Sequence, residues 1–379
     1  MKRKFDFWSV LAMCLCTALL SIGLMLGLVY KSLGGKEGME FIAKLNAVRA
    51  VVEEKYVGEM DWNEAADLAS EAIVEAAEDR WSYYMTADEY NSYTNRQNNS
   101  MVGIGVTVTA DPDNRGMEII SVVPGSPADR AGIKVGYILI GIEGESLADL
   151  DISVVGDLIR SHSGEYTIEC LDIDGKALSV TLQNEVIYLS PVSYELMDDD
   201  IGYIRINNFE KNAAAESMAA IKKLSEDGAQ SLIFDVRANP GGQLSELTQL
   251  LDYLLPEGEI FISVDAEGNE EIYTSNAESV EMSMVVLLDE NSYSAAEFFA
   301  AALREYEKAT LIGTPSTGKA RSQQTFIISD GSAVHISTRN YLTPERVNLA
   351  EEGGLVPDIV VESIADFDAA LARALEYLS

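Results

Sequence analysis

The chain has 379 residues, a formal net charge of −35 at pH 7 and only two histidines, His162 and His335. A chain of this length can form two or three domains with a sizeable core. Its negative field repels nucleic acid and anionic lipid headgroups, which argues against partners of those two classes. Two histidines far apart in sequence, without a clustered carboxylate partner, also argue against a metal site.

The first thirty residues form a hydrophobic N-terminal segment. Lys2, Arg3 and Lys4 precede Phe7–Tyr30, which contains no charged residue. This segment is long enough to span a hydrocarbon core of about 30 Å, whereas the apolar region of a secretory signal has roughly 7–15 residues. We therefore expect an uncleaved membrane anchor with its basic end in the cytoplasm. A cleaved signal peptide remains the alternative.

Composition and periodicity predict four regions: an anchor with a short linker at 1–35, a helical segment at 36–99, a small β domain at 100–186 and a larger core at 187–379. Cys14 and Cys16 lie inside the anchor and Cys170 is alone, so no disulfide framework is expected. The exported part must therefore be held together by its hydrophobic core.

Residues 36–99 have the pattern of amphipathic helices. Phe41, Leu45 and Val48 recur at steps of three and four residues. Thr86 followed by Glu89 is typical of a helix N-cap with a capping box. The polar run at 95–100 predicts a linker and a domain boundary.

Residues 100–186 have the alternation of a small β domain. Strands are predicted at 103–108, 118–122, 137–142, 166–171 and 177–182, and an amphipathic helix is predicted at 151–162. The last two strands form a hairpin across Asp174-Gly175, a strong turn dipeptide.

From residue 187 onward, strands and helices alternate. Strands are predicted at 201–206, 231–236, 284–288, 310–313, 325–328 and 333–337, with helices after Lys211, Gln243 and Ser294. Such alternation favours a layered α/β core.

A serine and a lysine follow two of these strands. Ser294 comes after 284–288 and opens an apolar helix, and Lys319 lies in the polar loop after 310–313. Turns that bring a hydroxyl and an amine to one sheet edge can form a nucleophile–base pair. A structural reading also exists, because Ser294 and Glu297 have the spacing of a capping box.

Lys319 can act as a base only if it is desolvated, since an unperturbed lysine with a pKa near 10.4 is almost fully charged at pH 7. Its neighbours at 316–320 are small and uncharged, and no carboxylate lies beside it in the sequence.

The turn Asn239-Pro240-Gly241-Gly242 is a candidate oxyanion hole. Its glycines would let backbone N–H groups approach an anion closely. The helix that begins after Ser294 offers the Ala295 N–H and the positive end of its dipole. We predict Gly241 and Ala295 as the donors; a plain βα turn is the alternative for the glycines.

This pattern of serine and lysine resembles that of the C-terminal processing peptidases, also called tail-specific proteases. Ser294 is followed twenty-five residues later by Lys319, and Gln323 comes four residues beyond. The segments read N-S-Y-S-A-A-E and T-G-K-A-R-S-Q, where the family typically has G-S-A-S-A-S-E and F-G-K-G-S-V-Q. Thr317 and Ala320 therefore depart from the family's phenylalanine and glycine beside the lysine.

Further segments carry the same resemblance, which spans roughly residues 40–361. D-R-W-S-Y-Y at 79–84 resembles the family's D-P-x-S-x-Y, and D-V-R-A-N-P-G-G at 235–242 resembles a core strand and turn. G-S-P-A at 125–128, with A-G-I at 131–133, resembles its PDZ module.

The resemblance implies the fold class α/β (α+β multidomain): a transmembrane helix, a helical segment, a PDZ-like β domain and a crotonase-like layered α/β protease core. It implies that Ser294 is the nucleophile, Lys319 the general base and Gln323 the residue that orients Lys319. It implies no metal and no organic cofactor. In the PDZ-like module, the loop predicted to bind a substrate's C-terminal carboxylate consists of Gly103, Ile104, Gly105 and Val106.

The resulting hypothesis is a membrane-anchored, exported serine endopeptidase that recognises protein substrates by their C-terminal tails and forms an acyl-enzyme. It would be a single-pass protein of the cell membrane with its catalytic part on the extracytoplasmic side. A homo-oligomer or an activating partner is left open. One rival is a catalytically inactive PDZ scaffold that binds exported tails. Another is a crotonase-like thioester enzyme that uses the oxyanion turn without the dyad.

Overall fold

Residues 6–362, 364–365 and 367–379 are described by the structure, a computed structural model. The chain divides into two units, one ending at Ala69 and one beginning at Ser70. The basic residues Lys2, Arg3 and Lys4, which set the predicted orientation of the anchor, lie outside the described residues.

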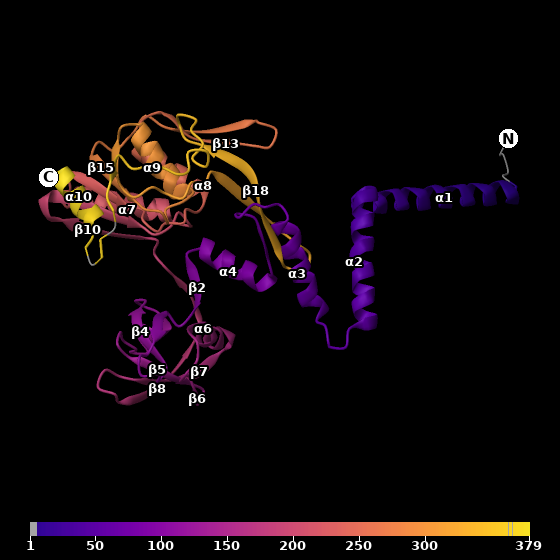
Figure 1. The fold of residues 1–379 in the computed structure, drawn as a ribbon, viewed down its shortest axis with the longest axis horizontal. Coiled ribbons are helices and arrows are strands. Elements are labelled where there is room, and N and C mark those ends of the chain that lie inside the picture. The colour runs from indigo at the N-terminus through magenta and orange to yellow at the C-terminus, as the bar shows by residue number, and fades with distance from the viewer. Residues whose placement is uncertain (1–5, 363, 366) are drawn as a thin grey trace. The chain divides into compact units, whose positions relative to one another are not determined.

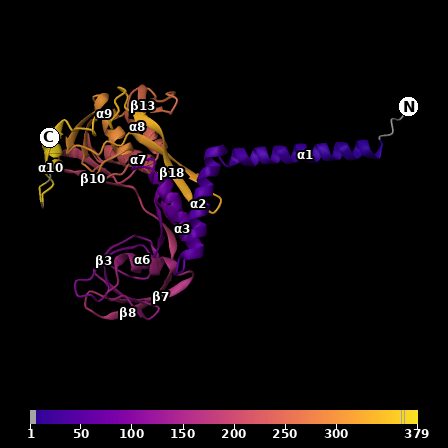
Figure 2. The same cartoon turned by 45° about the vertical axis from the view of Figure 1, so that its right-hand side comes forward.

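The N-terminal unit is helical. Helix α1 (Phe7–Ser32) begins at Asp6, whose carboxylate accepts the Ser9 N–H at 2.7 Å. It is long and apolar enough to cross a membrane, a criterion that a signal sequence also meets. The chain then turns sharply at Gly34, where φ is +76° (Figures 1 and 2), a conformation that glycine adopts without a steric penalty. Helices α2 (Gly35–Lys55) and α3 (Trp62–Glu75) follow.

A small β domain forms a sheet in the order β3-β4-β5-β7-β8, with β6 paired to β5. Its elements are β3 (Val106–Ala110), β4 (Met117–Val122), α5 (Pro127–Arg130), β5 (Ile138–Ile142), β6 (Glu145–Ser146), α6 (Ile152–Ser161), β7 (Glu165–Leu171) and β8 (Ala177–Gln183). The predicted hairpin is confirmed, because β7 and β8 are antiparallel neighbours and Gly175 between them has a φ of +77°.

The strand predicted at 103–108 is instead two strands, β2 (Ser100–Gly103) and β3. The chain bends at Gly105, whose φ is +82° and where a Cβ atom would lie 2.3 Å from the Ser126 Cβ. Strand β2 pairs with β9 (Glu185–Tyr188), so both chain crossings into the β domain run together as a two-stranded ribbon. The four domain boundaries stay a prediction.

The core contains two sheets. Its elements are β1 (Tyr83–Met85), α4 (Ala87–Gln97), β10 (Val192–Met197), the 3-10 turn η1 (Asp198–Asp200), β11 (Ile201–Ile206), α7 (Ala213–Glu226), β12 (Ser231–Asp235), α8 (Leu244–Leu254), β13 (Gly258–Val264), β14 (Glu270–Ser275), β15 (Ser283–Leu288), α9 (Ala295–Glu305), β16 (Ala309–Gly313), β17 (Arg321–Ile327), β18 (Ala333–Leu342), β19 (Ile359–Val360) and α10 (Ala369–Leu378). The capping box predicted at the start of α4 is present, with the Glu89 carboxylate 2.8 Å from the Thr86 N–H.

The larger sheet has the order β10-β11-β12-β15-β16-β19 and is parallel from β11 to β19. Alternate residues of its strands face opposite layers. Phe234 and Val286 belong to the cluster formed with α7, α8 and α9, whereas Ile233 and Val285 belong to the cluster formed with α10. The predicted layered α/β core is confirmed.

The second sheet packs against helices α8 and α9. Its order is β1-β18-β13-β14, with β17 also paired to β18. Phe261 on β13 contacts Phe298 on α9 and Tyr341 on β18, at ring-centroid distances of 5.2 and 4.5 Å. Both ribbon views show α8 and α9 close to β13, with α10 at the C-terminal side (Figures 1 and 2).

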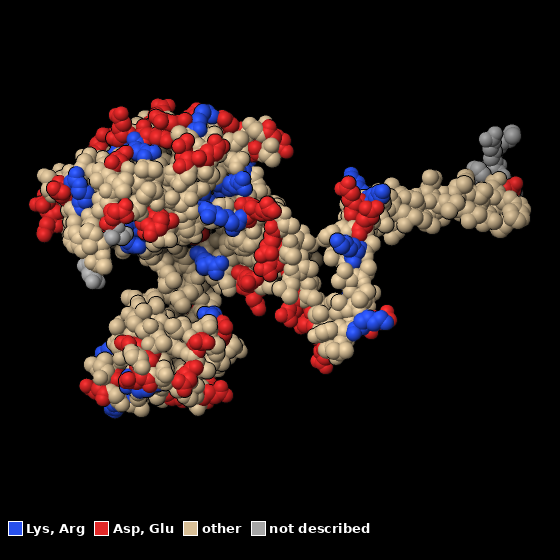
Figure 3. All heavy atoms as spheres, in the orientation of Figure 1, with Lys and Arg blue, Asp and Glu red and all other residues tan. Residues whose placement is uncertain are grey.

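The charged side chains are spread over the surface. On the face in Figure 3, acidic groups are scattered over the core and the small β domain, interspersed with basic ones. On this face the acidic groups are typical of a solvated surface and are not gathered around one motif.

Candidate active site

The loops that contain the candidate nucleophile and the candidate base begin at the same edge of the larger sheet. Strands β15 and β16 are parallel, with Leu288 opposite Gly313 at their carboxyl ends. The loop to Ser294 follows the first strand and the loop to Lys319 follows the second. Because carboxyl ends of parallel strands meet at one edge, both loops are brought together as the sequence predicted.

Ser294 sits in a strained backbone conformation. Its φ and ψ are 58° and −126°, directly before the first residue of α9, and its exposed fraction is 8%. Such a conformation costs a non-glycine residue about 1–3 kcal/mol and persists only where surrounding contacts enforce it. The strain motivates the hypothesis that the position of this side chain has a function beyond capping the helix.

Glu297 supplies the contacts that hold this serine. Its fully buried carboxylate accepts the Ser294 N–H at 2.9 Å. The N–H of Glu297 in turn donates to the Ser294 carbonyl oxygen at 2.9 Å. The capping box expected for Ser294 and Glu297 is therefore present, and its Glu297 N–H has a backbone acceptor besides the Ser294 hydroxyl.

The same carboxylate also holds the lysine loop. It accepts the Gly318 N–H at 2.6 Å and the Lys319 N–H at 2.8 Å, and the Ser316 hydroxyl donates to it as well. One buried side chain therefore fixes the backbone of both Ser294 and Lys319. The sequence indicates only a capping-box role for Glu297, because nothing in the local pattern points to its contacts with the second loop.

Lys319 lies among aromatic rings. Its Nζ is 4.6 Å from the centroid of Trp81 and 5.7 Å from that of Tyr293. Desolvation lowers the pKa of Lys319 to about 8, against the opposing effect of the Asp79 and Glu297 carboxylates. The two carboxylates come from distant segments, which the uncharged sequence around the lysine did not indicate.

Arg80 adds a second cation beside this lysine. Its guanidinium carbon lies 4.3 Å from the Trp81 ring centroid, and its charge also favours the neutral form of Lys319. With a pKa near 8, about a tenth of the lysine is neutral at pH 7. The predicted desolvation of the candidate base is therefore present in the geometry.

Replacing Trp81 by alanine is expected to move the pH dependence of activity upward. Removing the indole admits water to Lys319, so its pKa rises from about 8 toward the ordinary lysine value of 10.5. A rise of one unit in the pKa of Lys319 lowers kcat/KM about tenfold at pH 7 and leaves the alkaline plateau intact. A pH–rate profile measures this. The control is Trp62→Ala, which loses a ring contact with Arg49 instead and should keep the parent profile. An unshifted profile for Trp81→Ala would show that Trp81 does not keep water from Lys319.

The glycine turn contacts the serine directly. A Cβ atom on Gly241 would lie 2.8 Å from the Ala295 N atom and 2.8 Å from the Ser294 Cβ, so only glycine leaves this space empty. Among the described residues, the Ala295 N–H has no hydrogen-bond partner. The empty space therefore faces a free donor at the start of α9.

The prediction for Gly241 itself needs correction. Its N–H donates to the Asn239 Oδ1 at 2.8 Å and is not free to bind an oxyanion. Asn239 is fully buried and also donates from Nδ2 to the Ile206 carbonyl at 2.7 Å. The N–H without a partner in this turn, within the described chain, is that of Gly242. The local sequence could not show that a neighbouring amide would engage Gly241.

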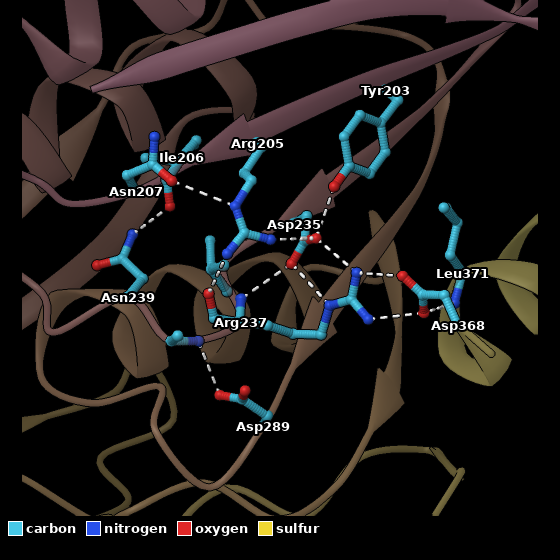
Figure 4. A network of polar contacts seen from close by, with 12 residues as sticks. Tyr203, Arg205, Ile206, Asn207, Asp235, Arg237, Asn239, Asp289, Asp368 and Leu371 are labelled. Atoms are coloured by element: carbon cyan, nitrogen blue, oxygen red, sulfur yellow. Dashed lines mark hydrogen bonds and ion pairs between the residues drawn. The ribbon is translucent and has the colours of Figure 1, made fainter. Parts of the chain in front are cut away.

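A network of ionic contacts anchors the turn to the end of β12 (Figure 4). The buried carboxylate of Asp235 accepts hydrogen bonds from Tyr203 at 2.6 Å, Arg205 at 2.8 Å and Arg237 at 2.7 Å. Burial alone would raise the pKa of Asp235, but the Arg237 guanidinium outweighs it and holds the pKa below its usual range. Arg237 also makes paired contacts with Asp368, the N-cap of α10, at 2.7 and 2.8 Å.

A further hydrogen bond holds the strained part of the turn in place. Ala238 has a φ of +56°, and its N–H donates to the Asp289 carboxylate at 2.8 Å. The sequence showed Asp235 and Arg237 only as part of a strand motif. Their function in fixing the turn depends on partners from three other segments.

Gln323 lies on β17 and lines the same cavity, but its amide group points to Ser337. Its Nε2 donates to the Ser337 hydroxyl at 2.9 Å and to the Arg321 carbonyl at 3.2 Å. Within the described chain no hydrogen bond joins Gln323 to Lys319. Its orienting role therefore stays a prediction.

Four of the predicted site residues border one cavity of about 650 Å³: Gly241, Ser294, Lys319 and Gln323. Ala295 lies beside it at the start of α9. The predicted tail-binding residues Gly103–Val106 belong to the small β domain and are absent from the described residues that line this cavity. The predicted catalytic residues thus border one cavity, and the loop predicted to bind tails is not part of its lining.

Each of the two histidines makes a hydrogen bond through its Nδ1. His335 lies on β18 at the cavity wall, 2.8 Å from the Thr325 hydroxyl through its Nδ1, and burial lowers its pKa to about 4. A neutral histidine of such low basicity is a poor general base. His162 follows α6, with its Nδ1 2.7 Å from the Leu158 carbonyl.

Comparison with known proteins identifies the family. The chain is 30% identical over 320 residues to a carboxyl-terminal-processing protease of a Synechocystis species, and the match covers 82% of this chain and 75% of that relative. The model for peptidase family S41 matches residues 200–361. The chain belongs to the carboxyl-terminal-processing proteases of family S41.

Other members of family S41 and its structural neighbours agree. A "Probable CtpA-like serine protease" of Staphylococcus haemolyticus is 27% identical over 369 residues, which cover 95% of this chain and 74% of that relative. The model for a PDZ domain matches residues 118–168. The fold is shared with a photosystem II D1 C-terminal processing protease, at a TM-score of 0.50 and 21% identity over 83% of this chain and 86% of the other. A Bacteroides fragilis structure described as an S41 protease has a TM-score of 0.56 and 18% identity over 85% and 92%.

Proposed function

We propose that this family S41 protein is a serine endopeptidase that uses Ser294 and Lys319 as a nucleophile–base dyad. The observation that carries the proposal is the shared cavity, where a strained, nearly buried serine lies with a desolvated lysine. A neutral lysine can accept the proton of a serine hydroxyl, which makes the oxygen nucleophilic. Glu297 holds the backbone of both residues.

In this mechanism the Ser294 Oγ attacks the scissile carbonyl while Lys319 takes its proton. The oxyanion of the tetrahedral intermediate accepts hydrogen bonds from the Ala295 and Gly242 N–H groups, neither of which has a partner among the described residues. Lys319 then gives the proton to the leaving amine, and an acyl-enzyme remains on Ser294. Water, deprotonated by Lys319, releases the product acid and restores the serine.

We infer that substrates are proteins recognised by their C-terminal tails. The small β domain offers the turn at Ile104-Gly105, next to strand β3, where an extended tail could add to the sheet and its carboxylate could meet backbone N–H groups. The PDZ match over residues 118–168 supports this role for the domain.

The decisive experiment uses the full chain in detergent micelles. It is incubated with an unfolded protein that has an apolar C-terminal tail and, separately, with a fluorophosphonate probe. The parent should cleave the protein and be labelled at Ser294, whereas Ser294→Ala should do neither and Lys319→Met should show at most trace cleavage. Tail binding without cleavage or labelling of the parent would reject the dyad and favour an inactive PDZ scaffold.

We infer further that α1 anchors the protein in the membrane, with the catalytic part on the extracytoplasmic side. The support is the length and apolar composition of Phe7–Ser32, together with the basic residues before it in the sequence. Mass spectrometry of the protein from cell membranes, after an alkaline wash, should find peptides of the first thirty residues. A mature chain that begins beyond residue 30 would show a cleaved signal instead.

A further inference from the structure

A second hollow continues the active-site cavity along helix α8. It has a volume of about 510 Å³ and lies between α8 and strand β14. Leu244, Ser245 and Tyr273 line both this hollow and the cavity of about 650 Å³ that contains Ser294. The shared residues make the two a continuous groove, here called the α8–β14 groove.

The walls of the groove are mostly uncharged. Thr248 and Gln249 come from α8, and Thr274 comes from β14. The carboxylate present, Asp252, accepts hydrogen bonds from the Asn276 N–H at 2.7 Å and its Nδ2 at 2.9 Å. A wall of this kind offers hydrogen bonds and moderate apolar contact to many kinds of substrate side chain. Its described residues include no unpaired charged group that would favour one kind of side chain over another.

Strand β14 is suited to hold a polypeptide in extended form. It is the last strand in the order β1-β18-β13-β14, and no described strand pairs with its outer edge. Such an edge presents unpaired N–H and C=O groups. An incoming peptide can pair with them regardless of its sequence.

The length of the groove gives the number of residues it can bind. Leu244 and Asp252, at its two ends along α8, are separated by eight helical positions and therefore by about 12 Å. An extended chain advances about 3.3 Å per residue, so this length fits about three or four substrate residues.

We propose that the α8–β14 groove binds the extended substrate polypeptide on one side of the scissile bond, over about three or four residues. The inference rests on the proposed protease function, because it takes the Ser294 cavity as the place of cleavage. The ligand class is a polypeptide main chain, with little selection among its side chains.

The test compares nested peptides with one fixed cleavage site, lengthened residue by residue either before or after it. With the full chain in detergent, kcat/KM should rise about tenfold over three or four added residues in one series and then level off. Gln249→Trp and Thr274→Trp block the groove from opposite walls at exposed positions. Both should abolish that rise and leave hydrolysis of the shortest peptide unchanged. Lys222→Trp, on the exposed face of α7, should behave as the parent.

Several outcomes would overturn the proposal. One is a rise with length that persists in both blocked variants, and another is a parent without any length dependence. Equal loss for the shortest and longest peptides in the blocked variants also counts against it, since that pattern means damage at Ser294. Fluorophosphonate labelling separates the two hypotheses. If the parent is labelled and cleaves the shortest peptide, only the groove is rejected; if it does neither, the proposed function fails with it.

Discussion

Lys319→Met is expected to lower kcat/KM by a factor of at least about 10³ at pH 8, because a positioned general base contributes 10²–10⁴ and Ser294 loses its only proton acceptor in the proposed mechanism. Methionine nearly preserves the length of the side chain and fits the apolar surroundings of Trp81 and Tyr293. The measurement is steady-state hydrolysis of a peptide substrate, with folding checked by circular dichroism. Parent-like activity in this variant would remove the lysine from the mechanism.

The same lysine sets the pH dependence of the parent. Because its pKa is lowered to about 8, kcat/KM should increase tenfold per pH unit below pH 8 and level off above it as the neutral amine forms. Lys319→Met should have a small residual rate without this limb. A parent profile that is already level between pH 6 and pH 8 would contradict the assignment.

Lys319→Met should raise the stability of the protein although it lowers the activity. Below pH 8 the folded protein buries a charged Lys319 that the unfolded chain leaves in water, at a cost on the order of 3 kcal/mol. The unfolded state binds the extra proton between pH 8 and about 10.5, so this cost is full at pH 7 and disappears as the pH rises through that window. Lys319→Met should therefore unfold at higher denaturant than the parent at pH 7, with a difference that shrinks by pH 10. A constant difference would contradict the burial of a charged amine.

Glu297→Ala is expected to cause the second large effect, on both stability and turnover. The substitution removes a buried acceptor from the backbone N–H groups of Ser294, Gly318 and Lys319 and from the Ser316 hydroxyl. Leaving such donors unpaired should lower the free energy of unfolding by about 3–5 kcal/mol. Chemical denaturation measures this loss.

Glu297→Gln tests the positioning of Ser294 and Lys319 separately from the stability of the fold. The amide keeps one acceptor oxygen but places an NH₂ group against backbone donors, so the two loops can no longer be held together as they are. We expect kcat to fall about 10²-fold with KM nearly unchanged, since the serine and lysine are misaligned and the substrate groove is not. Glu305→Gln, two turns later on α9, is the matched control and should keep the parent kcat. A parent-like kcat for Glu297→Gln at full folding would show that Glu297 does not position the dyad.

Much of the fold follows from local pattern. The hairpin across Asp174-Gly175, the capping box at Thr86 and Glu89 and the parallel strands before Ser294 and Lys319 were all predicted, because turn chemistry and hydrophobic periodicity act over a few residues. Strands β13 and β14 were missed. Their residues are only partly apolar in alternation, and the pairing of β13 with β18 is a contact between distant segments.

The site was predicted less completely than the fold. The sequence brought Ser294, Lys319, Gln323 and the glycine turn into one hypothesis, and the structure places them around one cavity. The sequence could not indicate that the Gly241 N–H would donate to the Asn239 side chain. Within the described residues, the free N–H in the turn is therefore that of Gly242 and not that of Gly241. Hydrogen-bond partners of a backbone amide depend on side-chain direction, which residue spacing alone does not encode.

The sequence by itself determined which residues can supply the chemistry: one serine at a helix start, one lysine after the neighbouring strand and a hydrophobic segment long enough to cross a membrane. Only the tertiary structure decided whether that lysine can be a base. Its pKa depends on the Trp81 and Tyr293 rings that exclude water and on the carboxylates and guanidinium around it, and most of these come from distant segments. Chemical identity is a property of the residue, whereas solvation and field are properties of the folded surroundings.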